Sequence, residues 1–208
     1  MPDDQYITAS CVISNHVVYK NETPVFGNKD VNLPGFLLSA YEHFEFKYPK
    51  FYKMDNLSKL GWLAAEVLLK QGFHTSHYHP DDIGVVLANS SSSLDTDIKY
   101  FQTTQTIASP ALFVYTLPNI MIGEICIRHN FKGENGFFIF EQFNAGFLQH
   151  YVNNLFNNNT LQACICGWVE LLDDEYKAVL FLVEKGTDTQ TARFSLENIN
   201  KIYQLENG

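Results

Sequence analysis

Residues 117–133 read Leu-Pro-Asn-Ile-Met-Ile-Gly-Glu-Ile-Cys-Ile-Arg-His-Asn-Phe-Lys-Gly, and an apolar run of strand length follows them at 136–140. Asn119 stands directly after a proline, where we expect it to cap a helix. Gly123 lies inside this predicted helix, and its missing side chain favours close packing on a neighbouring helix. The Lys-Gly pair at 132–133 predicts a turn. The stretch therefore predicts a helix that leads through a turn into a buried strand.

Apolar runs and helical periodicity recur along the rest of the chain. The run at 83–88 is apolar throughout, which is typical of a strand buried on both faces. Strands that alternate with helices predict an α/β fold, with a layered mixed sheet packed by helices. We predict further strands at 6–18, 162–169 and 178–184, helices at 56–71 (capped by Asp55), from about Asp95 and at 143–156, an irregular region at 20–50, and a weak helical pattern at 196–203.

The length of 208 residues predicts one domain and a short tail, which we place at 1–185 and 186–208. Hydrophobic residues make up 46% of the chain, which is enough for a sizeable core. The chain also contains 17 Phe and 11 Tyr residues. We expect part of this aromatic surface to contact a partner rather than the internal core.

The net charge and the cysteines limit the class of protein to which the chain can belong. A net charge of -9 argues against nucleic acid as a partner, because phosphate binding needs clustered Lys and Arg, and it disfavours an anionic membrane surface. We expect no signal peptide, because the start at 1–5 is acidic and polar, and no apolar run is long enough for a membrane span. Cys11, Cys126, Cys164 and Cys166 stand in apolar contexts that suit reduced thiols. These features predict a cytoplasmic protein.

Four segments resemble the N-terminal half of the β-ketoacyl synthases, condensing enzymes of the thiolase fold. In that family, a Pro-Asn helix and a Lys-Gly turn like those at 117–133 lead into a buried strand and then a nucleophilic cysteine. Residues 52–65 resemble its basic-Met-Asp segment, 83–88 its Val-Gly-Val-Val strand and 107–113 its Ser-Pro segment. The resemblance extends in register over 6–185 and implies the N-terminal half of a thiolase-like fold.

Gln142 stands where the family has its nucleophilic cysteine, at the same interval after the Lys-Gly turn. An amide cannot attack a thioester, because it has no thiolate form. The family's two catalytic histidines come from a C-terminal half, which we expect to be absent because the resemblance ends near Lys185. We therefore expect no catalytic residue, no metal and no cofactor, and we expect the chain not to be catalytic on its own.

A glutamine at the cysteine position also occurs in the chain-length factors, inactive partners that pair with an active synthase and shape the tunnel for the growing chain. The resemblance thus implies a non-catalytic, chain-length-factor-like subunit of fatty acid, polyketide or aryl-polyene type biosynthesis. Its partner would be a full-length β-ketoacyl synthase, with an acyl carrier protein as a second candidate partner. Phe113, Tyr115 and Met121 would line the acyl tunnel.

The strand at 136–140 is the predicted contact with that partner. In the family, the strand before the nucleophile pairs across a two-fold axis with its mate. A strand this apolar would favour aggregation at an open sheet edge unless another chain or domain covered it. We therefore expect a heterodimer with Phe138 at the interface. We expect Gln142 to have a structural or interface role rather than to bind an acyl carbonyl.

Two functions of other classes stay open. One is an enzyme, an acyl-ACP transferase or a malonyl-ACP decarboxylase that uses some other residue. The other is a free-standing module that binds acyl chains or carrier protein without a synthase. Only the chain-length-factor interpretation requires a partner synthase, so pairing distinguishes it from both.

Two groups of side chains have chemistry of their own to consider. His74, His77 and His79 are spaced so that they could share a metal ion, but no further ligand is obvious, and a polar turn before the strand explains them better. Cys164 and Cys166 are two positions apart and so face the same side of a strand. We expect them to be buried free thiols.

Overall fold

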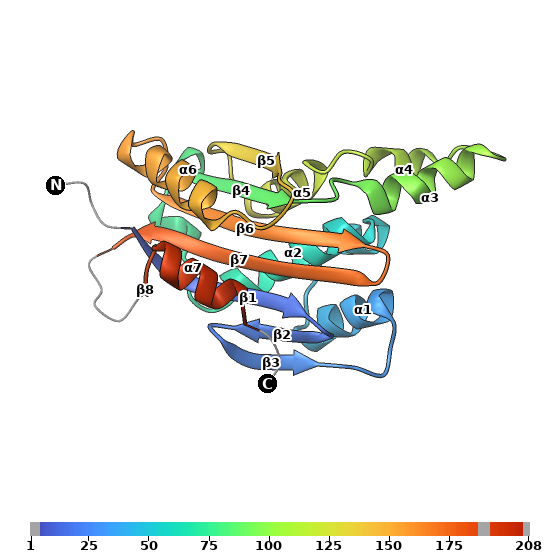
Figure 1. The fold of residues 1–208 in the computed structure, drawn as a ribbon, viewed down its shortest axis with the longest axis horizontal. Coiled ribbons are helices and arrows are strands. Elements are labelled where there is room, and N and C mark those ends of the chain that lie inside the picture. Colours follow the sequence, from blue (N-terminus) through green and yellow to red (C-terminus); the bar gives the residue numbers. More distant parts are fainter. Residues whose placement is uncertain (1–4, 187–191, 206–208) are drawn as a thin grey trace.

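The computed structural model describes residues 5–186 and 192–205. They form one eight-stranded sheet with helices on both faces (Figure 1). The strands are β1 (Gln5–Ser14), β2 (Val17–Lys20), β3 (Thr23–Gly27), β4 (Ile83–Asn89), β5 (Asn135–Ile139), β6 (Ala163–Leu172), β7 (Glu175–Lys185) and β8 (Ala192–Arg193). The helices are α1 (Leu33–His43), α2 (Asn56–Leu69), α3 (Leu94–Thr104), α4 (Pro110–Val114), α5 (Ile120–His129), α6 (Ala145–Asn157) and α7 (Leu196–Tyr203), and short 3-10 turns lie at Pro49–Lys53, Thr75–His77 and Pro80–Asp82.

The sheet is mixed, as the sequence predicted. Its strands follow the order β3-β2-β1-β7-β6-β4-β5, and β8 pairs with β1. β4 pairs in parallel with β5 and β6, whereas the other neighbours are antiparallel. β5 is the last strand in this order, so no described strand covers its outer edge.

Two hydrophobic layers cover the two faces of the sheet. Helices α1, α2 and α5 bury one face, with Phe36, Leu63 and Ile125 fully buried there. Helices α6 and α7 bury the other face, where Val152 and Ile199 are fully buried. All seven residues of β4 are buried, as its unbroken apolar run predicted. Helices α3 and α4 form a hairpin that projects beyond the ends of the strands (Figure 1).

Helix α2 confirms the predicted cap. Asp55 accepts a hydrogen bond from the Ser58 N–H at 2.9 Å, which satisfies one of the free donors of the first turn. The helix ends at Leu69, two positions before the predicted Gln71. Gln71 has a φ of 61°, a left-handed conformation that cannot continue an α-helix.

The prediction of one strand at 6–18 is wrong, because a two-residue turn divides it into β1 and β2. Asn15 and His16 have φ angles of 49° and 61°. Ser14 pairs directly with Val17 across this turn. Tight hairpin turns of this kind need positive φ at both central residues, and asparagine tolerates that conformation better than most residues do.

The prediction that residues 20–50 are irregular is also wrong, since the region contains β3 and α1. The side chain of Asn32 caps α1 by accepting from the Gly35 N–H at 3.0 Å. Pro34 stands in the first turn, where its missing N–H costs nothing. The asparagine and proline that read as punctuation of a loop are therefore the start signal of a helix.

Two details predicted for residues 117–133 are wrong. Asn119 has helical backbone angles, and its side chain makes no capping hydrogen bond. A Cβ built on Gly123 would have no neighbour within 4 Å, so this glycine does not permit close packing. The close approach to α5 is made instead by Gly61 of α2, against the side chain of Met121.

The C-terminal helix α7 packs on the sheet beside α6 (Figure 1). Ile199 and Ile202 are buried, and Gln149 Nε2 of α6 donates to Phe194 O at 3.0 Å. The weak helical pattern at 196–203 is thus a real helix with a buried face. The predicted acidic start at 1–4 and parts of the predicted tail, 187–191 and 206–208, lie outside the described residues.

Candidate functional site

Strand β5 has an inner edge bonded to β4 and an open outer edge. Phe140 N–H donates to Asn89 O at 3.0 Å, which fixes the inner side. Because the backbone groups of alternate residues point to opposite sides of a strand, the N–H and C=O of Phe137 and Ile139 point outward. The side chain of Ile139 is also 50% exposed. The outer edge therefore offers both backbone groups and an apolar side chain to another strand.

The predicted interface residue Phe138 supports this edge from one face of the sheet. Its ring centroid lies 4.7 Å from that of Phe147 and 5.1 Å from that of Tyr151, both on α6. Phe140 joins the cluster at 4.7 Å from Phe147. Phe138 is thus half-buried against its own chain, and Ile139 is the more exposed residue of β5.

Gln142 lies on the turn between β5 and α6, and its side chain is exposed. Asn144 follows it and caps α6 by accepting from the Phe147 N–H at 2.9 Å. Two clefts, of about 570 and 380 Å³, both have Glu141, Gln142 and Phe143 in their linings. In the isolated chain, solvent therefore reaches Gln142 through both clefts.

An aromatic contact joins the lining of these clefts to α7. Phe143 stacks on Tyr203 of α7, with ring centroids 3.8 Å apart and planes inclined by 3°. Lys177 Nζ lies 4.4 Å from the centroid of the Tyr203 ring, within cation–π range. Leu196 and Tyr203 of α7 each line one of the clefts. Helix α7 thus fixes the loop that carries Gln142.

Glu170 at the end of β6 fixes another wall of the smaller cleft. Its Oε2 accepts from the N–H and the hydroxyl of Ser90, both at 2.6 Å, and from the Ser91 N–H at 3.3 Å. Hydrogen bonds to a carboxylate are stronger than neutral ones. They hold the loop after β4 against the end of β6. No local sequence pattern marks Glu170, Phe143 or Tyr203 as part of this site, because each acts through a partner that is distant in the chain.

Three of the four thiols, those of Cys11, Cys126 and Cys166, have a raised pKa. All four cysteines are free, and Cys11, Cys164 and Cys166 are buried. Burial raises the pKa of Cys126 to about 11, and it raises the pKa of Cys11 and Cys166 above the ordinary range. A thiol with a raised pKa provides little thiolate at neutral pH. The prediction that Cys164 and Cys166 are buried free thiols on one face is confirmed.

The predicted tunnel residues are divided between the surface and the core. Phe113 on α4 is 59% exposed, and Ile107 in the same hairpin is 86% exposed. Tyr115 and Met121 are 7% and 1% exposed, and neither lines the two clefts at Gln142. In the isolated chain, Phe113 is therefore the predicted tunnel residue whose side chain reaches the surface.

Buried polar contacts anchor the α3–α4 hairpin to the body of the domain. Thr96 Oγ1 of α3 donates to the Asp55 carboxylate at the cap of α2. Ser93 Oγ donates to Thr116 O at 2.8 Å. Burial raises the pKa of Asp55, and the hydrogen bonds from Ser58 and Thr96 partly offset this rise.

A second anchor lies at the base of the hairpin, where α4 ends. Glu124 of α5 is 4% exposed, and its Oε1 lies 2.8 Å from Lys50 Nζ. The Tyr115 hydroxyl lies 3.4 Å from the same oxygen. Burial raises the pKa of Tyr115, and the charge of Glu124 raises it further. Tyr115 therefore stays neutral and acts as a donor in the core.

The three histidines before β4 lie on an exposed surface. His74 precedes the 3-10 turn Thr75–His77 and His77 ends it, and their ring centroids lie 5.3 Å apart. His79 Nδ1 accepts from the Asp81 N–H at 3.5 Å, at the start of the next turn. Within the described ranges, no group of three or more His, Cys, Asp or Glu residues is placed to hold a metal ion. None of the described helices has the length and apolar character to span a membrane.

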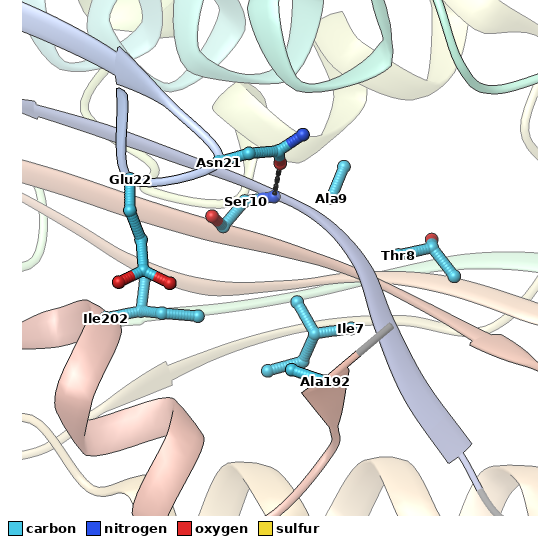
Figure 2. A pocket seen from close by; sticks show the side chains of 8 residues that line it. All are labelled: Ile7, Thr8, Ala9, Ser10, Asn21, Glu22, Ala192 and Ile202. Carbon is cyan, nitrogen blue, oxygen red and sulfur yellow. Dashed lines mark hydrogen bonds between the residues drawn. The ribbon is translucent and has the colours of Figure 1, made fainter. Parts of the chain in front are cut away.

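A separate cavity of about 250 Å³ lies at the irregularity in β1, between the β2–β3 turn and α7 (Figure 2). Figure 2 shows Glu22 and Ile202 at one end of this cavity and Thr8 at the other. Asn21 Oδ1 accepts from the Ser10 N–H at 2.9 Å. Glu22 Oε2 lies 2.8 Å from Lys201 Nζ in an ion pair. These polar groups satisfy one another, so the cavity needs no ligand to pair them.

Comparison with solved structures identifies the fold class. The chain is similar to the ishigamide ketosynthase/chain length factor, with a TM-score of 0.63 and 14% identity over 90% of this chain and 64% of that one. It is similar to a chain of AntDE:AntF, a type II PKS acyl-carrier protein in complex with its ketosynthase, with a TM-score of 0.62 and 13% identity over 89% and 63%. This chain thus spans slightly less than two thirds of the length of these two. Neither a protein-family model nor a curated protein matches the sequence.

A third structure is matched over most of both chains. It is the ketosynthase ApeO in complex with its chain length factor ApeC from Xenorhabdus doucetiae, with a TM-score of 0.58 and 12% identity over 96% of this chain and 90% of that one. Identities this low establish the fold alone. The chain has the thiolase-like fold of ketosynthases and chain length factors, which confirms the predicted fold class and the resemblance on which it depended.

Proposed function

We propose that this chain is a non-catalytic, chain-length-factor-like subunit that pairs with a full-length β-ketoacyl synthase. The observation that carries the proposal is Gln142, an exposed amide on the turn after edge strand β5. By resemblance, the family's nucleophile stands at this position. An amide offers no nucleophile, and Cys11, Cys126 and Cys166 have raised pKa values that disfavour their thiolates.

The contact with the synthase would be made by the outer edge of β5. Its outward backbone groups can pair with an edge strand of the partner, and Ile139 would contribute apolar area. Phe138 would stiffen the strand through its contacts with Phe147 and Tyr151. Two solved structures that share this fold are described as ketosynthases with chain length factors, which supports pairing of this kind.

The acyl chain would run beside the α3–α4 hairpin. Phe113 and Ile107 expose apolar side chains there, which could close an apolar tunnel once the partner supplies the opposite wall. Tyr115 and Met121 would act from behind this surface, because they are buried at the base of the hairpin. The products would be polyketide, fatty acid or aryl-polyene type chains.

An acyl carrier protein would meet a basic stretch of the surface. Four of the 14 Lys and Arg residues of this acidic chain fall within residues 47–59. Lys47, Lys50 and Lys53 are exposed there. Clustered ammonium groups would attract a carrier protein that presents an acidic surface.

The test is reconstitution with a full-length synthase from the same gene neighbourhood. Chain elongation from malonyl-carrier protein should require both proteins, and this chain alone should release no carbon dioxide from that substrate. Carbon dioxide release by this chain alone would support the decarboxylase alternative. A synthase that elongates equally well without this chain would support a free-standing binding module instead.

A further inference from the structure

A cavity of about 260 Å³ lies between the β2–β3 hairpin and the C-terminal ends of α1 and α2. It is at the opposite end of the strand order from β5 and shares no lining residue with the clefts at Gln142. Its polar walls include Lys20, His43 and Lys70. Its apolar walls include Val25, Phe44 and Val67.

Among the described residues, the ammonium groups of the two lysines of this cavity donate to backbone carbonyls. Lys20 Nζ donates to Lys70 O, and Lys70 Nζ donates to Phe44 O at 2.8 Å. Lys70 Nζ also lies 5.4 Å from the Phe44 ring and 5.3 Å from the Phe46 ring. Among residues 5–186 and 192–205, neither ammonium has a carboxylate within ion-pair distance. Each retains donors for a further acceptor.

Neither of these two charges is paired with a carboxylate among the described residues, although the chain is acidic overall. The sequence holds 23 acidic residues against 14 basic ones, so carboxylates are not scarce. Both lysines are half-buried. Burial lowers the pKa of Lys20; Cys11 acts against this shift, while the charge of Lys70 adds to it. An anion held between the two ammonium groups would offset the cost of burying these positive charges, and it would reduce the repulsion between them.

The size and the walls of the cavity limit the anion. At about 30 Å³ for each water-sized group, a cavity of this volume holds roughly eight such groups. Val25, Phe44 and Val67 favour an apolar part on the ligand rather than a fully hydrated ion. Inorganic phosphate would leave these walls without a contact.

We propose that this cavity binds a small organic carboxylate. The carboxylate lies between the ammonium groups of Lys20 and Lys70, with His43 at its side, and a short alkyl part contacts Val25, Phe44 and Val67. This site is independent of Gln142 and of pairing through β5. A failed test of this site would therefore leave the proposed function unaffected, and the reverse also holds.

Titration of the ¹⁵N-labelled full chain with hexanoate tests the site. We expect saturable shifts of the backbone amides of Phe44, Lys70 and Gln71, which line the cavity. Hexan-1-ol has the same alkyl chain without the charge, and inorganic phosphate has charge without the alkyl chain. Both should bind about tenfold more weakly than hexanoate, since each lacks one of the two interactions.

Matched variants locate the binding. Lys70→Gln and Lys20→Gln should each weaken hexanoate binding by about tenfold. Lys29→Gln removes an exposed charge that does not line the cavity and should leave the affinity within about twofold of the wild type. The proposal is overturned if the wild type shows no saturable shifts at these amides, or if hexan-1-ol or phosphate binds as tightly as hexanoate. These readouts on the wild type decide the matter even if a lysine variant fails to fold.

Discussion

The backbone of Gly61 in α2 lies directly against the side chain of Met121 in α5: a Cβ at position 61 would stand 1.9 Å from Met121 Sδ. The same two helices are joined by an ion pair, with Arg128 Nε 3.2 Å from the buried Glu66 carboxylate. Helix α5 leads through the Lys-Gly turn into β5. The close packing of α2 on α5 therefore sets the position of the edge strand.

Gly61→Ala should destabilise the chain by about 1–3 kcal/mol, because the buried Met121 side chain would have to move within the core to admit the methyl group. Gly123→Ala is the matched control inside α5. Its Cβ meets no neighbour within 4 Å, so it should stabilise the chain by up to about 1 kcal/mol through helix propensity. Urea unfolding followed by circular dichroism measures both. Changes of the same sign in the free energy of unfolding of the two variants would show that α2 and α5 leave room for the methyl group.

Asp55 caps α2 and also accepts a hydrogen bond from α3. Two replacements of Asp55 distinguish the effect of the cap from the effect of the negative charge. Asp55→Ala should cost about 1 kcal/mol of stability, because the Ser58 N–H loses its acceptor. Asp55→Asn should keep the cap and can donate to Thr96, so it should be at least as stable as the wild type at neutral pH.

The dependence of these stabilities on pH has a definite sign. Burial raises the pKa of Asp55 in the folded state, so the folded state holds this proton more tightly than the unfolded state does. The stabilising contribution is fully present below the ordinary carboxyl pKa and is lost as pH rises through the raised folded value. The stability of wild type relative to Asp55→Asn should therefore fall from acidic to neutral pH. A difference that rises with pH would contradict the raised pKa.

Tyr203 holds the loop that carries Gln142. Tyr203→Ala should remove about 1 kcal/mol of aromatic stacking on Phe143 and speed amide hydrogen exchange in residues 140–144. Tyr203→Phe keeps the ring and should leave that exchange nearly unchanged. Equal protection of the loop in wild type and Tyr203→Ala would mean that α7 does not fix it.

Phe113 tests the tunnel. In the reconstituted pair with a synthase, Phe113→Ala should lengthen the products, because the smaller side chain deepens an apolar channel. Leu38→Ala, which truncates an exposed apolar residue on α1, outside the hairpin and outside residues 47–59, should leave the product length unchanged. Mass spectrometry of the released chains reads both. Identical product lengths for Phe113→Ala and wild type would remove Phe113 from the tunnel.

Local patterns in the sequence were enough for most elements. The apolar run of β4 and the cap at Asp55 are each encoded by a few adjacent residues, so the strand and the start of α2 were predicted correctly. The turn at Asn15 and His16 was missed, because β-branched residues on both sides concealed a change of direction. Helix α1 was missed, because Asn32 and Pro34 occur in loops and at helix starts alike.

The surroundings of Gln142 depend on contacts between distant parts of the chain. The stacking of Phe143 on Tyr203 and the bonds from Ser90 to Glu170 follow from how α7 and β6 pack, which no local pattern encodes. The role of Gly61 shows the same limit. A glycine in the predicted α5 suggested close packing there, but the glycine that permits it stands on the opposite helix.

The most direct test of pairing uses the exposed edge residue rather than Phe138, because a charge at Phe138 would also disrupt its contact with Phe147. Ile139→Asp places a charge on the open edge, and Leu38→Asp places one on α1, which packs near the opposite edge of the sheet. Light scattering on a size-exclusion column should show a one-to-one complex with the synthase for wild type and Leu38→Asp, and separate proteins for Ile139→Asp. A one-to-one complex that still forms with Ile139→Asp would contradict the account. A wild type that forms no complex with the synthase would contradict it too.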